Sequence, residues 1–289
     1  MASRNSSSTS ATDARARARQ MQVDQQRKDR RRRSFVIWGS VLAAALVVAL
    51  IVAFMATRSN GEIPEAGPMP AVANDEGGIT LTSATELADT GQGEREVNST
   101  DVEVTESDAD QPESVPGSEE PADGEPANII LYVDFDCVHC YEFETSNSEQ
   151  IQSWVDEGKA TVEYRVVDYL STPANQSYSA RAANAAYCVA ATKPEAYGEY
   201  VSDLFAAYEG HQGKGLSDDE LTQRASDLGA DVSDCVKDDT YRPAVEYTTT
   251  KAQAAGVKGT PTVMVNGKNW ALDGADESFT DWAGAMIDG

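Results

Sequence analysis

The feature that most constrains this chain is an apolar run that leads directly into two cysteines three positions apart. Residues 129–135 are continuously apolar apart from one aspartate and rich in β-branched and aromatic side chains, which predicts a buried central strand. Cys137 and Cys140 follow at once, at the start of a segment with a helical pattern. A cysteine at a helix N-terminus lies beside unpaired N–H groups and the positive end of the helix dipole, which stabilise its thiolate. The sequence therefore predicts a reactive dithiol.

The two cysteines are predicted to have different roles. Cys137 is the expected attacking sulfur, because the thiolate is the nucleophile in disulfide exchange. Cys140 lies one turn deeper on the same helix face, close enough to form a disulfide, and is the expected resolving thiol. His139 can add positive charge that lowers the pKa of Cys137 further and makes its disulfide a stronger oxidant. Asp134 and Asp136 place negative charge nearby and oppose this effect, and the sequence leaves the balance open.

Other uses of a C-x-x-C pair fit this sequence less well. A c-type haem site needs histidine directly after the second cysteine, where Tyr141 stands. A zinc site needs four ligands at a recognisable spacing, and Cys188 and Cys235 form no second C-x-x-C pair in a chain with 2 histidines. A structural disulfide stays open, although so small a loop constrains the unfolded chain little. We expect no metal and no organic cofactor, only a redox-active disulfide between Cys137 and Cys140.

Charge divides the chain into two unequal parts. The net charge is -25, with 23 Lys and Arg against 48 Asp and Glu. Residues 1–33 hold 10 of these basic residues and 3 of the acidic ones, so the rest of the chain has 13 basic and 45 acidic residues and a net charge of -32. So acidic a remainder argues against a nucleic-acid partner, which requires a basic face. Residues 1–33 lack apolar periodicity and are predicted to be a disordered cytoplasmic tail.

An uncharged stretch follows this tail. Residues 35–56 carry no charge, and as a helix they would rise about 33 Å, which matches a hydrocarbon core of roughly 30 Å. Arginines precede the stretch and only Arg58 follows closely, so residues 34–57 are predicted to be a single transmembrane signal anchor. A cleaved signal peptide is the alternative, but it would have a shorter apolar core, and Phe54 stands where a small residue is favoured. The predicted location is the cell membrane, single-pass, with a cytoplasmic N-terminus and an extracytoplasmic catalytic domain.

The next segment is acidic. Residues 58–127 are rich in Gly, Pro, Ser, Thr, Asp and Glu, and residues 101–127 contain 10 acidic residues and no basic one. Self-repulsion predicts an acidic flexible linker. Residues 78–82 offer an alternative, because they have the pattern of a short edge strand that docks on the folded domain.

Residues 128–289 are predicted to form one α/β domain. A helix after the cysteines, a second helical piece at 149–157 and a strand at 160–167 complete a β-α-β unit with parallel strands. The helical pattern of residues 172–240 predicts an insertion, and a helix over 242–255 follows it. Strands at 262–265 and 268–272 are joined by Asn266 and Gly267, a pair typical of two-residue hairpin turns. A closing helix is expected at 277–287.

At the cysteine pair the chain resembles the DsbA-like branch of the thioredoxin superfamily, whose signature reads DFDCVHCYEF here. A second match is GVKGTPTVMVNG at residues 256–267, which resembles the cis-proline loop of that family. The resemblance implies a thioredoxin fold with a helical insertion, and a cis Pro261 that faces the Cys137 sulfur. It also implies that Thr260 and Val138 contact an extended substrate chain. The family often has proline where Val138 stands, and this middle pair tunes the redox potential.

The resemblance implies a membrane-anchored thiol-disulfide oxidoreductase. Such an enzyme gives its disulfide to unfolded exported proteins and is reoxidised by a quinone-linked membrane protein. Outside the cytoplasm two further cysteines usually pair, so Cys188 and Cys235 are expected to form a structural disulfide. Closing a loop of about 48 residues would stabilise the fold by roughly 4 kcal/mol. Two separate buried thiols are the alternative.

Three other functions stay open. The same site could run in reverse as a disulfide reductase or isomerase. The domain could be a chaperone-like binding module with an incidental dithiol, or a scaffold that docks through its acidic segment. His211 lies in a glycine-rich connection and is predicted to be a surface loop residue and not a catalyst.

Overall fold

A computed structural model of the chain describes residues 63–105, 108–211 and 213–288. The predicted cytoplasmic tail, residues 1–33, and the predicted signal anchor, residues 34–57, lie outside the described residues. Within the described ranges no helix is both long and apolar enough to span a membrane.

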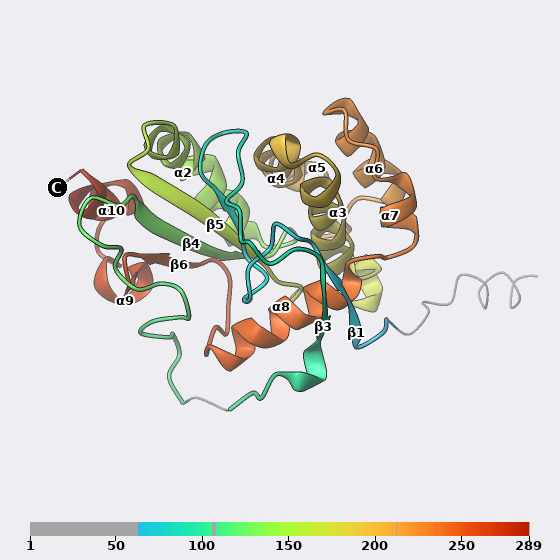
Figure 1. Cartoon of the computed structure of the whole chain (residues 1–289), viewed down its shortest axis with the longest axis horizontal. Coiled ribbons are helices and arrows are strands. Elements are labelled where there is room, and N and C mark those ends of the chain that lie inside the picture. The colour runs from blue at the N-terminus through green and yellow to red at the C-terminus, as the bar shows by residue number, and fades with distance from the viewer. Residues whose placement is uncertain (1–62, 106–107, 212, 289) are drawn as a thin grey trace, which may run out of the picture. The chain divides into compact units, whose positions relative to one another are not determined.

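A five-stranded sheet forms the centre of the fold, with the strand order β2-β5-β4-β6-β7. Figure 1 shows its three middle strands, β5, β4 and β6, side by side. Its strands are, in chain order, β2 (Ile79–Leu81), β4 (Ala127–Val133), β5 (Ala160–Val166), β6 (Thr262–Val265) and β7 (Lys268–Asn269). Strands β4 and β5 run parallel, and every other neighbouring pair is antiparallel. The carboxyl ends of β4 and β5 therefore meet at one edge of the sheet.

Helices cover the sheet and form the predicted insertion, which Figure 1 shows gathered at one end of the sheet as α3 to α7. The helices are α2 (Val138–Asp156), α3 (Tyr178–Thr192), α4 (Tyr197–Ala206), α5 (Tyr208–His211), α6 (Asp218–Asp227), α7 (Ser233–Lys237), α8 (Arg242–Ala254), α9 (Trp270–Asp273) and α10 (Phe279–Ile287). Short 3-10 turns are η1 (Ser99–Asp101), η2 (Pro173–Asn175) and η3 (Pro194–Ala196).

Strand β4 is apolar from Ile129 to Val133, where both of its faces are buried. Ile129, Leu131 and Val133 belong to the large core that includes residues of α2 and α10. Ile130 and Tyr132 belong to a second, smaller core beside α8. Successive side chains of a strand point to opposite faces, so only an uninterrupted apolar run can serve both cores.

The prediction of a flexible linker over residues 58–127 is wrong for most of that segment. Strand β1 (Ala66–Met69) pairs with β3 (Arg95–Asn98), and β2 extends the main sheet beside β5. The alternative prediction of an edge strand at 78–82 is therefore confirmed. The compact unit begins at Ile63 and not at residue 128. The average composition of the segment predicted disorder, but a few deeply buried side chains, such as Met69 and Ile79, anchor this otherwise acidic segment to the fold.

The end of the acidic segment is also tied to the sheet. The Asn269 amide donates a hydrogen bond to the Pro112 carbonyl at 2.7 Å, and the Asn128 amide donates to the Glu119 carbonyl at 2.8 Å. Val115 is buried in the smaller core beside α8. Backbone groups held in this way cannot act as a free tether.

Two predicted boundaries also differ from the structure. No helix boundary occurs near residue 148, because Ile151 and Trp154 continue the buried face of α2. The last strand does not reach residue 272, because the Asn269 side chain accepts a hydrogen bond from the Ala271 N–H and caps α9. Asn266 and Gly267 form the predicted turn, with φ values of 49° and 80°.

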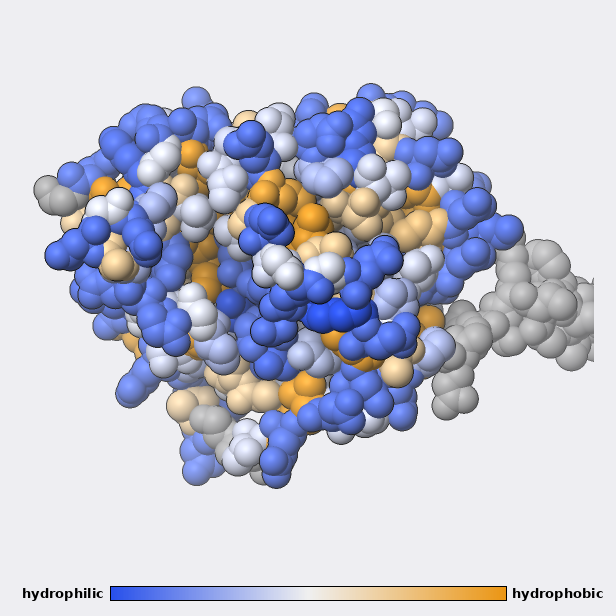
Figure 2. Space-filling view, viewed as in Figure 1, coloured by the Kyte–Doolittle hydropathy of each residue, from blue (hydrophilic) through white to orange (hydrophobic). Residues whose placement is uncertain are grey.

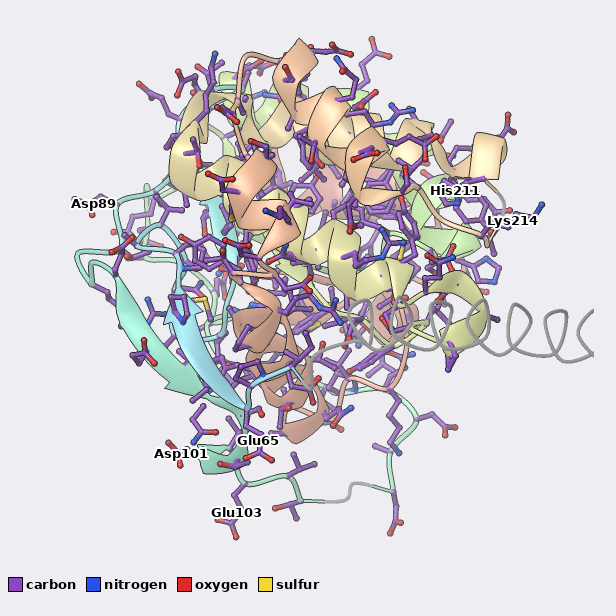
Figure 3. The ribbon with its side chains drawn as sticks, turned by 90° about the vertical axis from the view of Figure 1, so that its right-hand side faces the viewer. Glu65, Asp89, Asp101, Glu103, His211 and Lys214 are labelled. Carbon is purple, nitrogen blue, oxygen red and sulfur yellow. A yellow bond between two sulfur atoms is a disulfide. The ribbon has the colours of Figure 1, made fainter. Side chains whose placement is uncertain are left out.

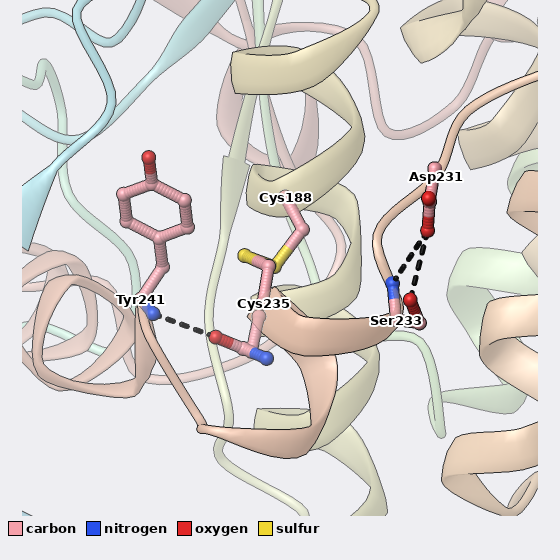
Figure 4. The surroundings of a disulfide bond; sticks show 6 residues. Cys188, Asp231, Ser233, Cys235 and Tyr241 are labelled. Carbon is pink, nitrogen blue, oxygen red and sulfur yellow. Dashed lines mark hydrogen bonds between the residues drawn. A yellow bond between two sulfur atoms is a disulfide. The ribbon is translucent and has the colours of Figure 1, made fainter.

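The helical insertion is held together by the predicted disulfide between Cys188 on α3 and Cys235 on α7 (Figure 4). Close to it, the Asn184 side chain accepts a hydrogen bond from the Tyr241 N–H at 2.7 Å, which fixes the start of α8 against α3. The disulfide thus links two helices of the insertion, and the hydrogen bond links the insertion to α8.

The surface is mostly polar. The face drawn in Figure 2 is largely hydrophilic, with apolar side chains in small patches. The large apolar side chains that remain exposed in the described ranges are Val104, Val138, Leu170 and Leu272. Val138 directly follows Cys137, and Leu170 lies in the loop after β5.

The docking of the acidic segment predicts unequal effects of two alanine substitutions. Ile79→Ala removes a fully buried side chain and is expected to lower the free energy of unfolding by about 2–4 kcal/mol. Val104→Ala, in the same segment but exposed, should change it by less than about 0.5 kcal/mol. Urea unfolding of the purified protein measures both values. Two negligible effects would show that the segment does not contribute to the fold.

Candidate active site at the cysteine pair

The two cysteines lie where strand β4 passes into helix α2, at the carboxyl edge of the sheet. Cys137 is the N-cap residue of α2, with an extended backbone at φ -90° and ψ 119°. Its N–H donates to the Asp134 carbonyl at 3.1 Å, which closes the turn between strand and helix. The Cys137 side chain therefore sits at the N-terminal end of the helix, as the sequence predicts.

The surroundings of Cys137 favour its thiolate. The hydrogen bond from the Cys140 thiol, with further ones from the backbone N–H groups of His139 and Cys140, lowers the pKa of Cys137 from 9.0 to about 5, although burial opposes this shift. Cys137 is 7% exposed, so the sulfur remains within reach of another molecule. At neutral pH this sulfur is a thiolate.

Cys140 has the opposite properties. It is fully buried, and burial raises the pKa of its thiol well above 9.0, with the hydrogen bond that it gives to Cys137 as the second cause. At neutral pH the reduced pair therefore holds one proton, on Cys140. A substrate meets Cys137 first.

His139 stabilises the Cys137 thiolate through its backbone N–H and not, as predicted, mainly through the charge of its ring. Its side chain is 72% exposed, and its Nδ1 lies 3.0 Å from the Glu142 carboxylate, which raises the pKa of His139 above 6.5. The imidazole thus pairs with Glu142, and the backbone N–H of His139 makes the hydrogen bond to the Cys137 sulfur. Any effect of the ring charge on Cys137 acts across solvent and is reduced by Glu142.

Asp134 is much less of an opposing charge than the sequence suggests. It is fully buried, and burial raises the pKa of its carboxyl from 3.8 to about 7. Its two oxygens accept hydrogen bonds from the N–H groups of Asp136 at 2.8 Å and Leu170 at 2.9 Å. The carboxyl therefore fixes the active-site turn to the loop after β5, and it carries only part of a charge near neutral pH.

The loop before strand β6 contacts the dithiol at Cys137. The Thr260–Pro261 peptide bond is cis, as predicted. The Cys137 thiol, when protonated, donates a hydrogen bond to the Thr260 carbonyl at 3.3 Å, although 123 residues separate them in the sequence. Val138 and Leu170, each 41% exposed, add apolar surface beside the site.

Residues 122–283 match the protein family described as Thioredoxin. The match covers more than half of the chain and includes both cysteines and the cis peptide. The chain belongs to the thioredoxin family. No curated protein is a significant match to the sequence.

Three solved structures are similar to this thioredoxin-family chain. Oxidised DsbA of Mycobacterium tuberculosis has 30% sequence identity, with 60% of this chain and 97% of that chain covered and a TM-score of 0.47. MdbA of Actinomyces oris, a thiol-disulfide oxidoreductase, has 19% identity, 58% and 82% coverage and a TM-score of 0.50. Oxidised BdbD of Bacillus subtilis has 18% identity, 63% and 100% coverage and a TM-score of 0.50.

Family membership and the asymmetric dithiol identify this chain as a thiol-disulfide oxidoreductase of the thioredoxin family. The redox chemistry resides in the two thiols of Cys137 and Cys140. In the described part of the chain no group of three or more His, Cys, Asp or Glu side chains is arranged to hold a metal ion.

Several polar residues behind the dithiol were not foreseen. Glu144 is buried on α2, where burial raises the pKa of its carboxyl from 4.5 to about 7, and the Tyr164 hydroxyl donates to it at 3.4 Å. Its position four residues after Cys140 on one helix face could have revealed it. Asn175, whose amide holds Asp136 at 2.8 Å, comes from the start of the insertion and has no comparable sequence signal.

The prediction that His211 is a surface loop residue is wrong. His211 ends α5 and is 7% exposed, in contact with the rings of Tyr178 and Tyr208. The neighbouring glycines suggested an exposed turn, but the insertion folds this histidine inward toward the active-site turn.

The thiol asymmetry predicts a distinctive alkylation profile of the reduced enzyme. The iodoacetamide reaction rate of Cys137 should follow a titration with a midpoint near pH 5, because its thiolate is the reactive form. Cys140→Ala should raise that midpoint, because it removes the largest stabilising hydrogen bond. Mass spectrometry assigns the modified residue. A midpoint near pH 9, or preferential labelling of Cys140, would contradict this assignment.

Glu144→Gln is expected to make the reduced protein less sensitive to rising pH. A carboxyl whose folded pKa is raised keeps its proton in the folded state after the unfolded chain has lost it, so stability falls as pH rises from about 4.5 through 7. The full shift corresponds to about 3 kcal/mol. The difference in unfolding free energy between pH 4 and pH 8 should therefore shrink by up to that amount.

Glu149→Gln, an exposed carboxyl on the same helix, is the matched control and should keep the pH dependence of the parent protein. Identical pH profiles for Glu144→Gln and the parent would show that Glu144 is ionised in the folded state.

Proposed function

We propose that this thioredoxin-family chain donates its active-site disulfide to exported proteins during oxidative folding. The observation that carries the proposal is the contrast between the acidic thiol of Cys137 and the buried, protonated thiol of Cys140. Interactions that stabilise a thiolate exist only in the reduced state. They therefore favour reduction of the enzyme and make its disulfide a strong oxidant.

The reaction has two exchanges. A substrate thiolate attacks the Cys137 sulfur, the bond between Cys137 and Cys140 breaks, and the leaving electron pair stays on the Cys140 sulfur, which takes up a proton. A second substrate thiolate then attacks the substrate sulfur of the mixed disulfide, and Cys137 leaves as a thiolate. The substrate loses two electrons and gains a disulfide, and the enzyme gains both electrons.

The surroundings of Cys137 support an extended peptide as substrate. The cis Thr260–Pro261 loop presents backbone beside the sulfur. The exposed apolar side chains of Val138 and Leu170 belong to residues that adjoin the active-site turn, since Val138 follows Cys137 and the Leu170 N–H binds Asp134. Backbone contacts and small apolar patches accept many sequences, which suits an enzyme with many unfolded substrates.

The proposed location is outside the cytoplasm, with residues 34–57 as a membrane anchor. The uncharged stretch after a basic segment supports this orientation, and the Cys188–Cys235 disulfide is typical of an oxidising compartment. Each catalytic cycle leaves a reduced enzyme, so the proposal includes a membrane protein that passes two electrons to a quinone.

Equilibration with glutathione tests the direction of electron flow. The active-site disulfide should have a reduction potential well above the value of about -270 mV of thioredoxin and closer to about -120 mV. Cys137→Ser should abolish disulfide formation in a reduced, unfolded substrate, and Cys140→Ser should accumulate the mixed disulfide. A potential near that of thioredoxin would favour the reductase alternative.

A further inference from the structure

The carboxyl group next to the attacking cysteine has one oxygen without a hydrogen bond. Asp136 is 8% exposed, and its Oδ2 accepts a hydrogen bond from the Asn175 amide at 2.8 Å. Its Oδ1 is buried and has no hydrogen-bond partner among the described residues. A negative charge in this position disfavours the Cys137 thiolate, because like charges repel strongly where water is excluded.

The group that faces this free oxygen is the buried histidine of the insertion. The Nδ1 atom of His211 lies 3.9 Å from Oδ1 of Asp136. Both ring nitrogens of His211 are buried and lack a hydrogen-bond partner in the described part of the chain. The separation exceeds a hydrogen bond by about 1 Å, which a small side-chain movement or one bridging water closes.

Leaving these atoms unpaired would be unfavourable, since each buried polar atom without a partner costs about 1–3 kcal/mol. Tyr178 and Tyr208 pack edge-on against the imidazole at centroid distances of 4.7 Å and 5.5 Å, so the ring is held in place and has little access to solvent. The free Asp136 oxygen and the His211 Nδ1 atom, 3.9 Å apart, can therefore satisfy each other.

We propose that His211 is a positioning residue for disulfide exchange, which donates its Nδ1 proton to the free oxygen of Asp136 and so weakens the negative field on Cys137. The helical insertion then contributes directly to the acidity of the attacking thiol, through a residue that lies 74 positions after Cys137 in the sequence. The inference rests on the thiol-disulfide exchange activity and not on the direction proposed for it.

The neutral imidazole is sufficient for this role. Burial lowers the pKa of His211, Arg224 lowers it further, and Asp136 and Glu220 oppose both effects. At neutral pH the ring therefore has a single proton, which the proposal places on Nδ1. In acid the ring gains a second proton, and an ion pair with Asp136 then favours the Cys137 thiolate more strongly.

The test compares two replacements of His211. His211→Phe keeps an aromatic ring against Tyr178 but has no proton to donate, and His211→Gln keeps a donor. For His211→Phe we expect a higher pKa of Cys137, measured by thiolate absorbance, and a glutathione equilibrium shifted roughly threefold to tenfold toward the enzyme disulfide. His211→Gln should stay within about twofold of the parent enzyme.

Lys214→Gln is the matched control for charge. Figure 3 shows Lys214 beside His211 at the same end of the insertion, and its side chain is exposed. Removing this charge should leave the pKa of Cys137 and the glutathione equilibrium unchanged. An equal effect of Lys214→Gln and His211→Phe would overturn the proposed contact.

A double substitution separates positioning from packing. Asp136→Asn should lower the pKa of Cys137, and in that background His211→Phe should have no further effect on the glutathione equilibrium. A packing role would lower the melting temperature equally in both backgrounds and leave the equilibrium of the single variant unchanged, which would overturn the inference. If His211→Phe does not fold, His211→Met, which also lacks a donor, supplies the same comparison.

Discussion

The structure depends on keeping one sulfur charged and its neighbour, three residues away, neutral. Cys137 meets the free N–H groups of a helix N-terminus, and Cys140 is buried one turn below. This contrast requires that α2 start at a fixed point over the sheet edge. The buried strand β4 on one side and the long buried face of α2 on the other supply that fixed point.

Buried polar side chains behind the dithiol also hold the active-site turn in place. Asp134 and Glu144 are buried carboxyls whose pKa values are raised to about 7, an arrangement that lowers stability at neutral pH. Asp136, Asn175 and His211 connect the active-site turn with the insertion. The insertion is therefore more than a cover for the sheet, since its residues determine the electrostatic surroundings of the attacking thiol.

Local signals predicted most of the fold and the centre of the site. The dithiol at a helix start and the turn at Asn266 depend on residues close in sequence, whereas the cis Pro261 was implied by the family resemblance. The structure contains all three. Apart from the edge strand at 78–82, the folding of residues 63–105 was missed, because composition averages over the few buried side chains that anchor a segment. His211 was misplaced because its burial depends on how the whole insertion packs, which neighbouring residues do not encode.

The most direct measurement compares the stability of the oxidised and reduced enzyme. Thiolate interactions at Cys137 exist only in the dithiol form, so the redox and folding equilibria are linked through one thermodynamic cycle. Urea unfolding at pH 7 should show the reduced protein to be more stable than the form with the Cys137–Cys140 disulfide, with the Cys188–Cys235 bond intact in both. A more stable oxidised form would contradict the account, because the helix N-terminus would then favour the disulfide.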